Sequence, residues 1–435
     1  MKMNNMKTMG AVVAIGLAFV AQADPDAVRV AASNSTEIAR RAADYVCTGV
    51  GDELTIQRAI EDCARTGRQL SLSSGFYTFS AVHAFKDGGP DTAVCIPNMH
   101  RDFAITGERR KLGGWAKGMG TNAVNGVVFY LAPEALAAVK GASVDIVRGE
   151  WSQYGIMNGS GLTMENVCIW APDSQHALRA LDLRRVNSVE LHNVRLFALG
   201  KASLSGLKYP YGNPPVPNED CIGITLTDGS NNAPVNLVNV SAGGFGQSFQ
   251  VGGEHVVMIN CSATFGLYGF TFGNYRYDCA FNHPITLINC CDEQNVNLPL
   301  FNSCGDNGGN LHGRQSVTMI SFNTERVASH VPGKKLGSLM RETKPGTWCG
   351  QISFTTQPDW GAVNAVNLPL WEEDGSGRGF RTVNDTHKLA CTTAERLSYY
   401  PQYMQQVFDT DLNKLLICVD PAKRKWVDAN GVEVR

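Results

Sequence analysis

The sequence has almost no excess of charge of either sign. Its 38 Lys and Arg residues nearly balance 40 Asp and Glu residues, so the formal net charge is -2, and only 18% of the residues are charged. A protein that binds nucleic acid through bulk positive charge is therefore not expected. The sequence also lacks a Ser/His/Asp nucleophile motif, a phosphate-binding loop, a dinucleotide fingerprint and paired Cys-x-x-Cys units at zinc spacing.

Long hydrophobic runs are missing as well. The one apolar run near the N-terminus, Gly10 to Ala21, has about 12 residues, fewer than the roughly 20 that span a bilayer. A basic stretch precedes this run and Ala21-Gln22-Ala23 ends it, so we expect residues 1–23 to be a secretory signal peptide; an uncleaved anchor and a buried helix are the alternatives. The expected product is secreted, periplasmic or on the cell surface, with no membrane span.

Cysteine is present but does not form a recognisable disulfide scaffold. All 13 Cys residues follow the expected signal peptide, and their odd number leaves at least one without an intramolecular partner. A chain of this length can build its core without disulfide bonds. The pairing of the cysteines stays open at the level of the sequence.

A short pattern recurs from about residue 160: apolar, any, apolar, any, Asn, then Val or Cys. Alternating apolar residues indicate a strand with one face inward, and Asn favours a turn at its end. Successive asparagines are 27, 46, 21 and 29 residues apart, and we interpret the spacing of 46 as two coils of about 23 residues. The asparagines of the pattern are Asn166, Asn193, Asn239, Asn260 and Asn289.

A second series of alternating strands lies between these copies, at 180–183, 222–224, 249–251 and 270–272. Two strands per coil with Gly-rich corners predict an all-β parallel β-helix, in which stacked coils bury one continuous core. A β-sandwich is the alternative, although sandwiches favour hairpin turns. Residues 53–65 place Leu54, Ile56, Ala59, Ile60 and Cys63 on one helical face, so a short helix is expected to cap the N-terminal end.

Three segments near the N-terminus resemble the opening of the pectate-lyase superfamily of right-handed parallel β-helix proteins: Asp44 to Glu53, Ile56 to Ile60 and Leu70 to Tyr77. With the repeats, the resemblance covers roughly residues 44–330. It implies the fold but no single activity, because this scaffold carries lyases, glycoside hydrolases, epimerases, viral tailspikes and inactive binders.

The C-terminal end resembles the short module found on many phage tail-fibre and gut-bacterial β-helix proteins. Val407 to Lys414 and Lys425 to Gly431 carry this resemblance, while Leu415 to Cys418 departs from it where such modules usually have a Trp. We expect a small β unit with no catalytic role. The expected organisation is a signal peptide at 1–23, a linker at 24–43, the β-helix at 44–345, a connecting segment at 346–390 and the module at 391–435.

Candidate chemistry lies along the second strand series, whose outward positions are predicted to form a shallow groove. Asp182, Gly223, Gln250 and Thr271 are expected in one row, with Arg179, Asp220, Gln247 and Tyr268 leading into these strands. A carboxylate pair serves glycoside hydrolysis, and a base with a cation serves β-elimination of a uronate. Tyr209 and Tyr211 lie in a proline-rich loop suited to stacking on sugar rings, and together with Gln250 and Tyr268 they are the expected substrate-binding residues.

Glu219-Asp220-Cys221, Gly244-Phe245-Gly246 and Arg276 are similar in order to the motifs of polygalacturonase-like glycoside hydrolases. The sequence departs from that pattern: Glu219 replaces an Asp, Phe245 stands where the His belongs, and no Lys follows Arg276. Asp220 also suits a turn before the strand.

Polar residues cluster beside other strands of the first series. Candidates for an acid/base pair precede such strands: Glu254, His255 and His283. Candidates for an oxygen-rich Ca²⁺ site follow one: Asp292, Glu293 and Asn295. No cofactor is expected to be required. Polar corner residues that satisfy turn backbone are the alternative.

The sequence therefore favours a carbohydrate-active protein whose partner is a polysaccharide, as a monomer or homotrimer, with catalytic candidates Glu219, Asp220, Asp182, Glu254, His255, His283 and Arg276. The competing interpretation is a non-catalytic glycan-binding or structural protein of the cell surface or tailspike type.

Overall fold

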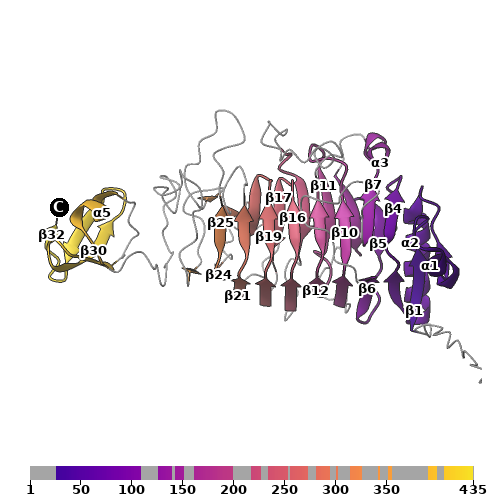
Figure 1. The fold of residues 1–435 in the computed structure, drawn as a ribbon, viewed down its shortest axis with the longest axis horizontal. Coiled ribbons are helices and arrows are strands. Elements are labelled where there is room, and N and C mark those ends of the chain that lie inside the picture. Colours follow the sequence, from indigo (N-terminus) through magenta and orange to yellow (C-terminus); the bar gives the residue numbers. More distant parts are fainter. Residues whose placement is uncertain are drawn as a thin grey trace, which may run out of the picture.

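The computed structural model describes residues 26–108, 126–139, 143–150, 161–198, 217–226, 234–252, 255–272, 281–293, 300–301, 314–325, 341–342, 351–354, 390–398 and 406–434. These residues form a right-handed parallel β-helix, as expected from the repeats, followed by a small β sheet (Figure 1). The signal-peptide prediction for 1–23 lies outside the described residues. In the described part of the chain, no helix has the length and apolar character needed to cross a membrane.

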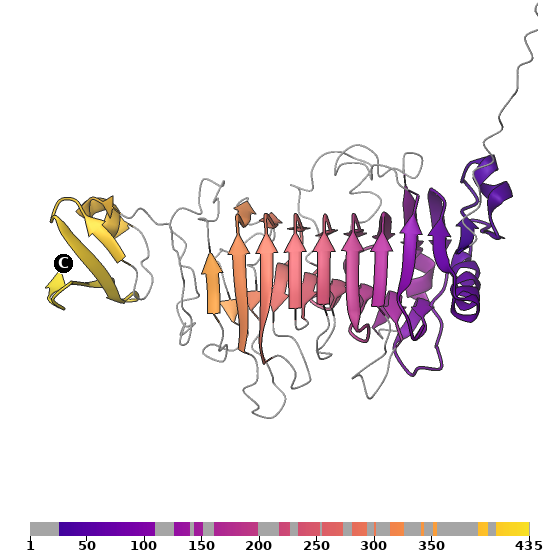
Figure 2. The same ribbon diagram turned by 90° about the horizontal axis from the view of Figure 1, so that it is seen from below.

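Each coil contributes strands to three parallel sheets, where the sequence predicted two strands per coil. The third strand is short and follows the repeat asparagine directly, so the sequence pattern merges it with the strand before. Figure 2 shows the strands of sheet A side by side. In spatial order sheet A contains β2 (Tyr45–Val46), β1 (Ala27–Ala31), β3 (Gln69–Leu72), β6 (Phe103–Gly107), β9 (Gly161–Glu165), β12 (Ser188–His192), β15 (Pro234–Val238), β18 (His255–Ile259), β21 (Phe281–Ile288), β24 (Arg314–Ile320) and β27 (Gln351–Phe354).

Sheets B and C extend along the solenoid axis beside sheet A. Sheet B contains β4 (Gly75–Phe79), β7 (Val127–Leu131), β10 (Val167–Trp170), β13 (Arg195–Phe197), β16 (Ser241–Gly243), β19 (Ser262–Thr264), β22 (Cys291–Glu293) and β25 (Asn323–Glu325). Sheet C contains β5 (Asp91–Ile96), β8 (Val144–Gly149), β11 (Leu178–Asp182), β14 (Cys221–Thr225), β17 (Gln247–Val251), β20 (Tyr268–Phe272), β23 (Leu300–Phe301) and β26 (Arg341–Glu342).

The repeat asparagines form the corner between sheets A and B. All five have left-handed backbone, with φ between 51° and 57°, a conformation that Asn tolerates better than most residues. The Asn193 amide donates to Asn166 Oδ1 at 2.8 Å, and the Asn289 amide donates to Asn260 Oδ1 at 2.7 Å. This stacking confirms the asparagine ladder on which the prediction of a solenoid rested.

The register corrects one reading of the repeat. β12 pairs directly with β15, with Val189 beside Val235, so the spacing of 46 residues is one long coil and not two coils. The extra length falls mainly between β13 and β14 and includes the proline-rich segment with Tyr209 and Tyr211, which lies outside the described residues.

Two domain boundaries also differ from the expected ones. The supposed linker at 24–43 contains β1, which pairs in parallel with β3, and the exposed helix α1 (Glu37–Ala42). At the other end β27 pairs with β24, so sheet A continues beyond residue 345. The solenoid is therefore longer at both ends than predicted. The predicted boundaries came from the composition of the sequence, whereas the observed ones are set by hydrogen bonds between strands of sheet A.

The N-terminal end is closed by α2 (Asp52–Thr66), within a residue at each end of the predicted helix. Ile56, Ala59, Ile60 and Cys63 are buried as expected, whereas Leu54 is 53% exposed. The Asp52 carboxylate accepts hydrogen bonds from the backbone N–H groups of Thr48, Gly49 and Thr78 at 2.9–3.0 Å, which fix the helix to sheet B. A short helix, α3 (Pro133–Ala137), lies between β7 and β8.

The C-terminal residues form the small β unit that the sequence predicted. Its strands are β28 (Ala390–Cys391), β29 (Gln406–Asp409), β30 (Lys414–Asp420), β31 (Lys425–Asp428) and β32 (Glu433–Val434), with helix α5 (Thr393–Ser398) beside them. Buried Arg396 pairs with Asp409 at 2.8 Å, and Trp426 belongs to its core.

Candidate functional site

The outward row on sheet C consists of Arg148, Asp182, Thr225, Gln250 and Thr271, which are neighbours in the register. The sequence placed Gly223 in this row, and the structure places Thr225 there instead. A side chain at Gly223 would lie only 2.5 Å from the carbonyl oxygen of Ser248. Gly223 therefore serves close packing between strands.

Hydrogen bonds join the polar side chains on this face. Thr225 Oγ1 donates to Gln250 Oε1, Gln250 Nε2 donates to Gln247 Oε1, and Gln247 Nε2 donates to the carbonyl oxygen of Glu219, each at 3.0 Å. Gln250 and Tyr268, two expected substrate-binding residues, are each 6% exposed. Gln247 and Arg179 are the more accessible members of the face.

Glu219 and Asp220 occupy an exposed turn before β14. The backbone N–H of Asp220 donates to Asn218 Oδ1 at 2.9 Å, an Asx turn of the kind the sequence allowed. Asp182 pairs with Thr225, five residues after Asp220, so the two carboxylates are separated by about 16 Å along the strand. That separation exceeds the roughly 9.5 Å of an inverting carboxylate pair.

The polygalacturonase-like motif is not assembled on this surface by the residues that the structure describes. Phe245 is fully buried in the solenoid core, where a catalytic His would have no access to substrate. Arg276 and Glu254 lie outside the described residues. His255 is exposed at the start of β18 and His283 lies in β21, both in sheet A and not in sheet C.

Asp292, proposed as a cation ligand, lies in β22 and is fully buried. It pairs with Ala263 of the core, and its Oδ2 lies 2.4 Å from where a Cβ of Gly269 would be, so its carboxylate fills the space that this glycine leaves. Asn295 and the side chain of Glu293 lie outside the described residues. Among the described residues, no group of three or more His, Cys, Asp or Glu side chains is arranged to hold a metal ion.

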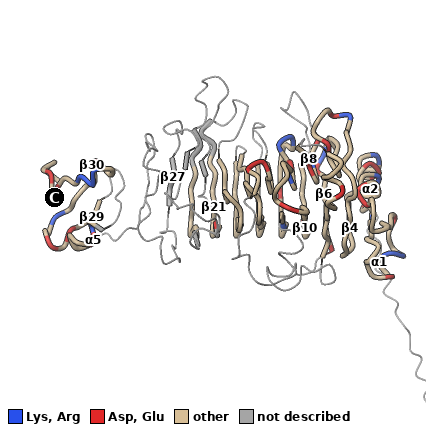
Figure 3. The backbone as a smooth tube through the Cα atoms, turned by 90° about the horizontal axis from the view of Figure 1, so that it is seen from above, with Lys and Arg blue, Asp and Glu red and all other residues tan. Residues whose placement is uncertain are grey.

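A compact cluster of charges occupies the N-terminal half of the sheet C face, and Figure 3 shows basic and acidic segments side by side around β8. Adjacent strands present these charges in reciprocal order: Asp145 of β8 faces Arg179 of β11, and Arg148 faces Asp182. Asp87, from the loop before β5, and Arg184 complete the set. The cluster therefore contains three carboxyl groups and three guanidinium groups.

The two central carboxylates have different partners. Arg184 binds both oxygens of Asp182, with the closest contact at 2.6 Å, and Arg148 binds Asp87 at 2.7 Å. Asp145 lies 3.5 Å from Arg148 and 3.6 Å from Arg179, and neither of its oxygens accepts a hydrogen bond within the described structure. Asp145 and Asp182 are 0% and 1% exposed, beneath Arg179 and Arg184, whose side chains are 19% and 20% exposed.

These surroundings shift the pKa values of Asp145 and Asp182 in opposite directions. Burial, reinforced by the charge of Asp182, raises the pKa of Asp145 to about 7. Burial also acts to raise the pKa of Asp182, but the hydrogen bonds and charge of Arg184 outweigh it and hold that pKa below its usual range. At pH 7 Asp145 is therefore about half protonated while Asp182 is ionised, and acid/base catalysis uses carboxyl pairs whose pKa values are separated in this way.

Of this cluster, the sequence analysis identified Asp182 as a catalytic candidate and Arg179 as a neighbour, and missed Asp87, Asp145, Arg148 and Arg184. A usable signal was present. Two otherwise apolar strands carry charges three residues apart in opposite order, Asp145 with Arg148 and Arg179 with Asp182.

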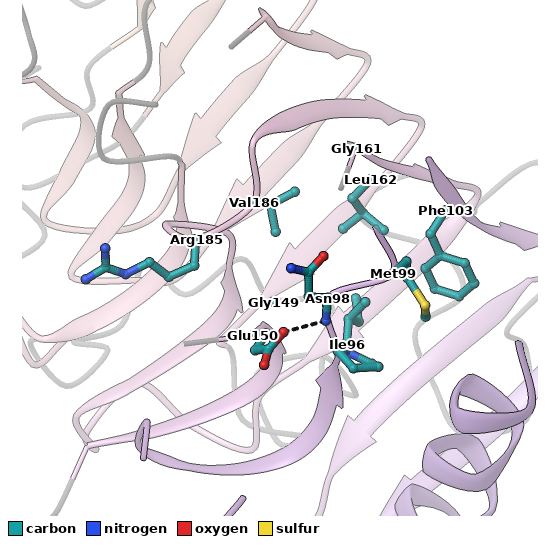
Figure 4. Close-up of a pocket in the computed structure, with 11 residues that line it drawn as sticks. Ile96, Asn98, Met99, Phe103, Gly149, Glu150, Gly161, Leu162, Arg185 and Val186 are labelled. Atoms are coloured by element: carbon teal, nitrogen blue, oxygen red, sulfur yellow. Dashed lines mark hydrogen bonds between the residues drawn. The ribbon is translucent and has the colours of Figure 1, made fainter. Parts of the chain in front are cut away.

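A small cavity lies where sheet C turns toward sheet A (Figure 4). Its volume is about 20 Å³, room for one water molecule. Ile96, Met99, Phe103 and Leu162 make it mainly apolar, and the backbone N–H of Asn98 donates to Glu150 at 2.6 Å at its edge. A cavity of this size is a small gap in the packing between coils and does not accommodate a sugar.

Comparisons with known proteins add nothing to what the structure shows. No family model and no curated protein matches the chain. Among solved structures, tailspike protein 3 of bacteriophage CBA120 is found at 10% identity and a TM-score of 0.19, covering 87% of this chain and 67% of that one. A likeness this weak carries no argument about fold or function, so the fold assignment rests on the order and pairing of the sheets.

Proposed function

We propose that this protein binds a linear polysaccharide along the outer face of sheet C, as a member of the pectate-lyase superfamily of β-helices. The supporting observation is the set of partly or fully exposed hydrogen-bonding side chains of Arg179, Gln247, Glu219 and Asp220, spread over three successive coils above a polar layer. These coils span about 10 Å along the axis, an extended shape that fits a chain of sugars. Guanidinium, amide and carboxylate groups are suited to hydrogen-bonding sugar hydroxyls.

We further propose that bound polysaccharide is cleaved by hydrolysis at the charged cluster. Asp145 in its protonated form is the proton donor to the glycosidic oxygen, and ionised Asp182 is the second carboxylate. Because both lie beneath Arg179 and Arg184, these guanidinium groups must move aside before the glycan reaches the acids. The separated pKa values of Asp145 and Asp182 support this second proposal. The proposal that the protein binds a polysaccharide does not depend on it.

Binding is tested by screening the purified protein on an array of linear polysaccharides and then measuring affinity for the best binder. Arg179→Gln is expected to weaken affinity about tenfold, the loss of one charged hydrogen bond, while Arg179→Lys retains part of it. Arg65→Gln on the exposed side of α2 is the control and should bind as the natural chain does. If no linear polysaccharide binds, or if both Gln variants bind equally, the binding surface is wrong.

Cleavage is followed with the bound polymer by size-exclusion chromatography and a reducing-end assay. Asp145→Asn and Asp182→Asn should retain binding but lose product formation by about a hundredfold or more, since proton transfer contributes about 10²–10⁴ in rate. A polymer that binds and stays at full length contradicts hydrolysis and leaves a non-catalytic binder. Shortened products that absorb in the ultraviolet would instead mean β-elimination.

A further inference from the structure

Cys261 and Cys290 occupy equivalent places in two successive coils. Each follows a ladder asparagine, and the pairs on either side, Ile259 with Ile288 and Ser262 with Cys291, are in register. Neighbouring strands lie about 4.8 Å apart, within the 4.4–6.8 Å that disulfide bonds span between Cα atoms. The backbone therefore already provides the separation that a disulfide between these residues requires.

Both sulfur atoms lie inside the solenoid, and each approaches the coil before its own: Cys261 Sγ lies 3.6 Å from the carbonyl oxygen of Leu237. Both side chains are 0% exposed, both belong to the main core, and their thiols are in hydrogen-bond contact. Cys290 Sγ also lies 3.4 Å from the carbonyl oxygen of Met258, which belongs to the coil of Cys261. The Cys290 side chain therefore leans across the gap between coils.

The hydrogen bond distinguishes the two thiols chemically. It lowers the pKa of Cys290, while burial and the neighbouring Cys290 raise the pKa of Cys261. In the folded chain Cys290 is therefore the more readily ionised of the two; in disulfide exchange the thiolate is the reactive form.

We propose that Cys261 and Cys290 form a disulfide bond through the interior of the solenoid, linking the coil that contains β18 to the coil that contains β21. A small-molecule disulfide such as glutathione disulfide is the oxidant. One of the two cysteines, as its thiolate, attacks one of the glutathione disulfide sulfurs and releases one thiolate; the other cysteine, once deprotonated, attacks the mixed disulfide and releases a second. Two protein thiols become one disulfide, and the two leaving thiolates take up the two protons.

Burial determines when this reaction takes place. Neither sulfur is accessible in the folded chain, so the bond forms while the two coils are stacking, and afterwards the core shields it from reductants. The bond closes a loop of about 30 residues, which restricts the unfolded chain and stabilises the central coils.

The test uses the full chain refolded with either glutathione disulfide or reduced glutathione, then unfolded in denaturant, alkylated and digested with trypsin without reduction. Cleavage after Arg276 separates the two cysteines. Mass spectrometry should find the Cys261 peptide joined to the Cys290 peptide in the oxidised sample and both alkylated in the reduced one. Fully alkylated Cys261 and Cys290 in the oxidised sample would overturn the proposal without any variant.

Because the Cys290 peptide contains further cysteines, variants assign the bond. Cys290→Ala and Cys261→Ala should each abolish the joined peptide, whereas Cys221→Ala, a change at another fully buried cysteine, should retain it. A joined peptide that survives Cys290→Ala would mean that another cysteine, such as Cys291, is the partner, and would reject the assignment.

Discussion

Asp145 is the single residue with the least balanced surroundings on the sheet C face. Its carboxyl is fully buried, yet two guanidinium groups approach it only at 3.5 and 3.6 Å. Longer contacts compensate less of the cost of burying a negative charge, so the protonated form is favoured. The sign of its effect on stability follows directly from this.

The stability difference between Asp145→Asn and the natural chain should grow with pH. The folded pKa of about 7 lies above the ordinary 3.8, so the contribution of Asp145 to stability is fully present below pH 4 and is lost as pH rises through 7. The asparagine variant does not ionise and should gain up to about 4 kcal/mol relative to the natural chain between pH 4 and 8. Urea unfolding at several pH values measures the difference, and a constant difference would contradict a buried titrating carboxyl.

At the scale of elements, the turn between sheets A and B depends on a side chain and on a backbone conformation together. Asn193 has φ of 53° and donates to Asn166 across the coil boundary. Its left-handed backbone positions the strand of sheet B, while its amide links neighbouring coils. The two contributions can be separated by substitution.

Asn193→Ala should destabilise the protein by about 2–3 kcal/mol, because alanine is strained at positive φ and the amide hydrogen bond is lost. Asn193→Gly should cost only about 1 kcal/mol, since glycine adopts this backbone without strain. Chemical denaturation of the three proteins measures both values. Equal losses for Ala and Gly would mean that the left-handed backbone contributes nothing.

At the scale of the whole molecule, the solenoid is stabilised by contacts between neighbouring coils, so a local defect should stay local. The N-terminal end depends on α2, whose Asp52 carboxylate receives three backbone hydrogen bonds. Removing it leaves these donors without their acceptor in a buried place.

Asp52→Ala should therefore speed hydrogen exchange in β3 and β4 by about tenfold or more while leaving β15 and β18 unchanged. Mass spectrometry of the exchanged peptides reads out each region. The control, Glu37→Ala on the exposed helix α1, should change neither region. Equal acceleration along the whole chain would contradict independent coils and mean that the solenoid opens as one unit.

The repeating strands, the asparagine corners and the capping helix could all be predicted from the order of the residues. Each is a local property: period-2 apolar residues bury one strand face, Asn tolerates a left-handed turn, and Ile56, Ala59 and Ile60 follow helical spacing. The C-terminal β unit was likewise evident from its own turns and strands.

Which residues meet between coils could be seen only once the coils were stacked in three dimensions. Insertions of different length hide the register, so Asp145 and Arg179, 34 residues apart, could not be paired from their spacing. The same uncertainty placed Gly223 in the row that Thr225 occupies and made one long coil look like two. The direction of a side chain depends on where each corner turns, which is why Asp292 lies inside the core and Asp182 on the outer face of sheet C.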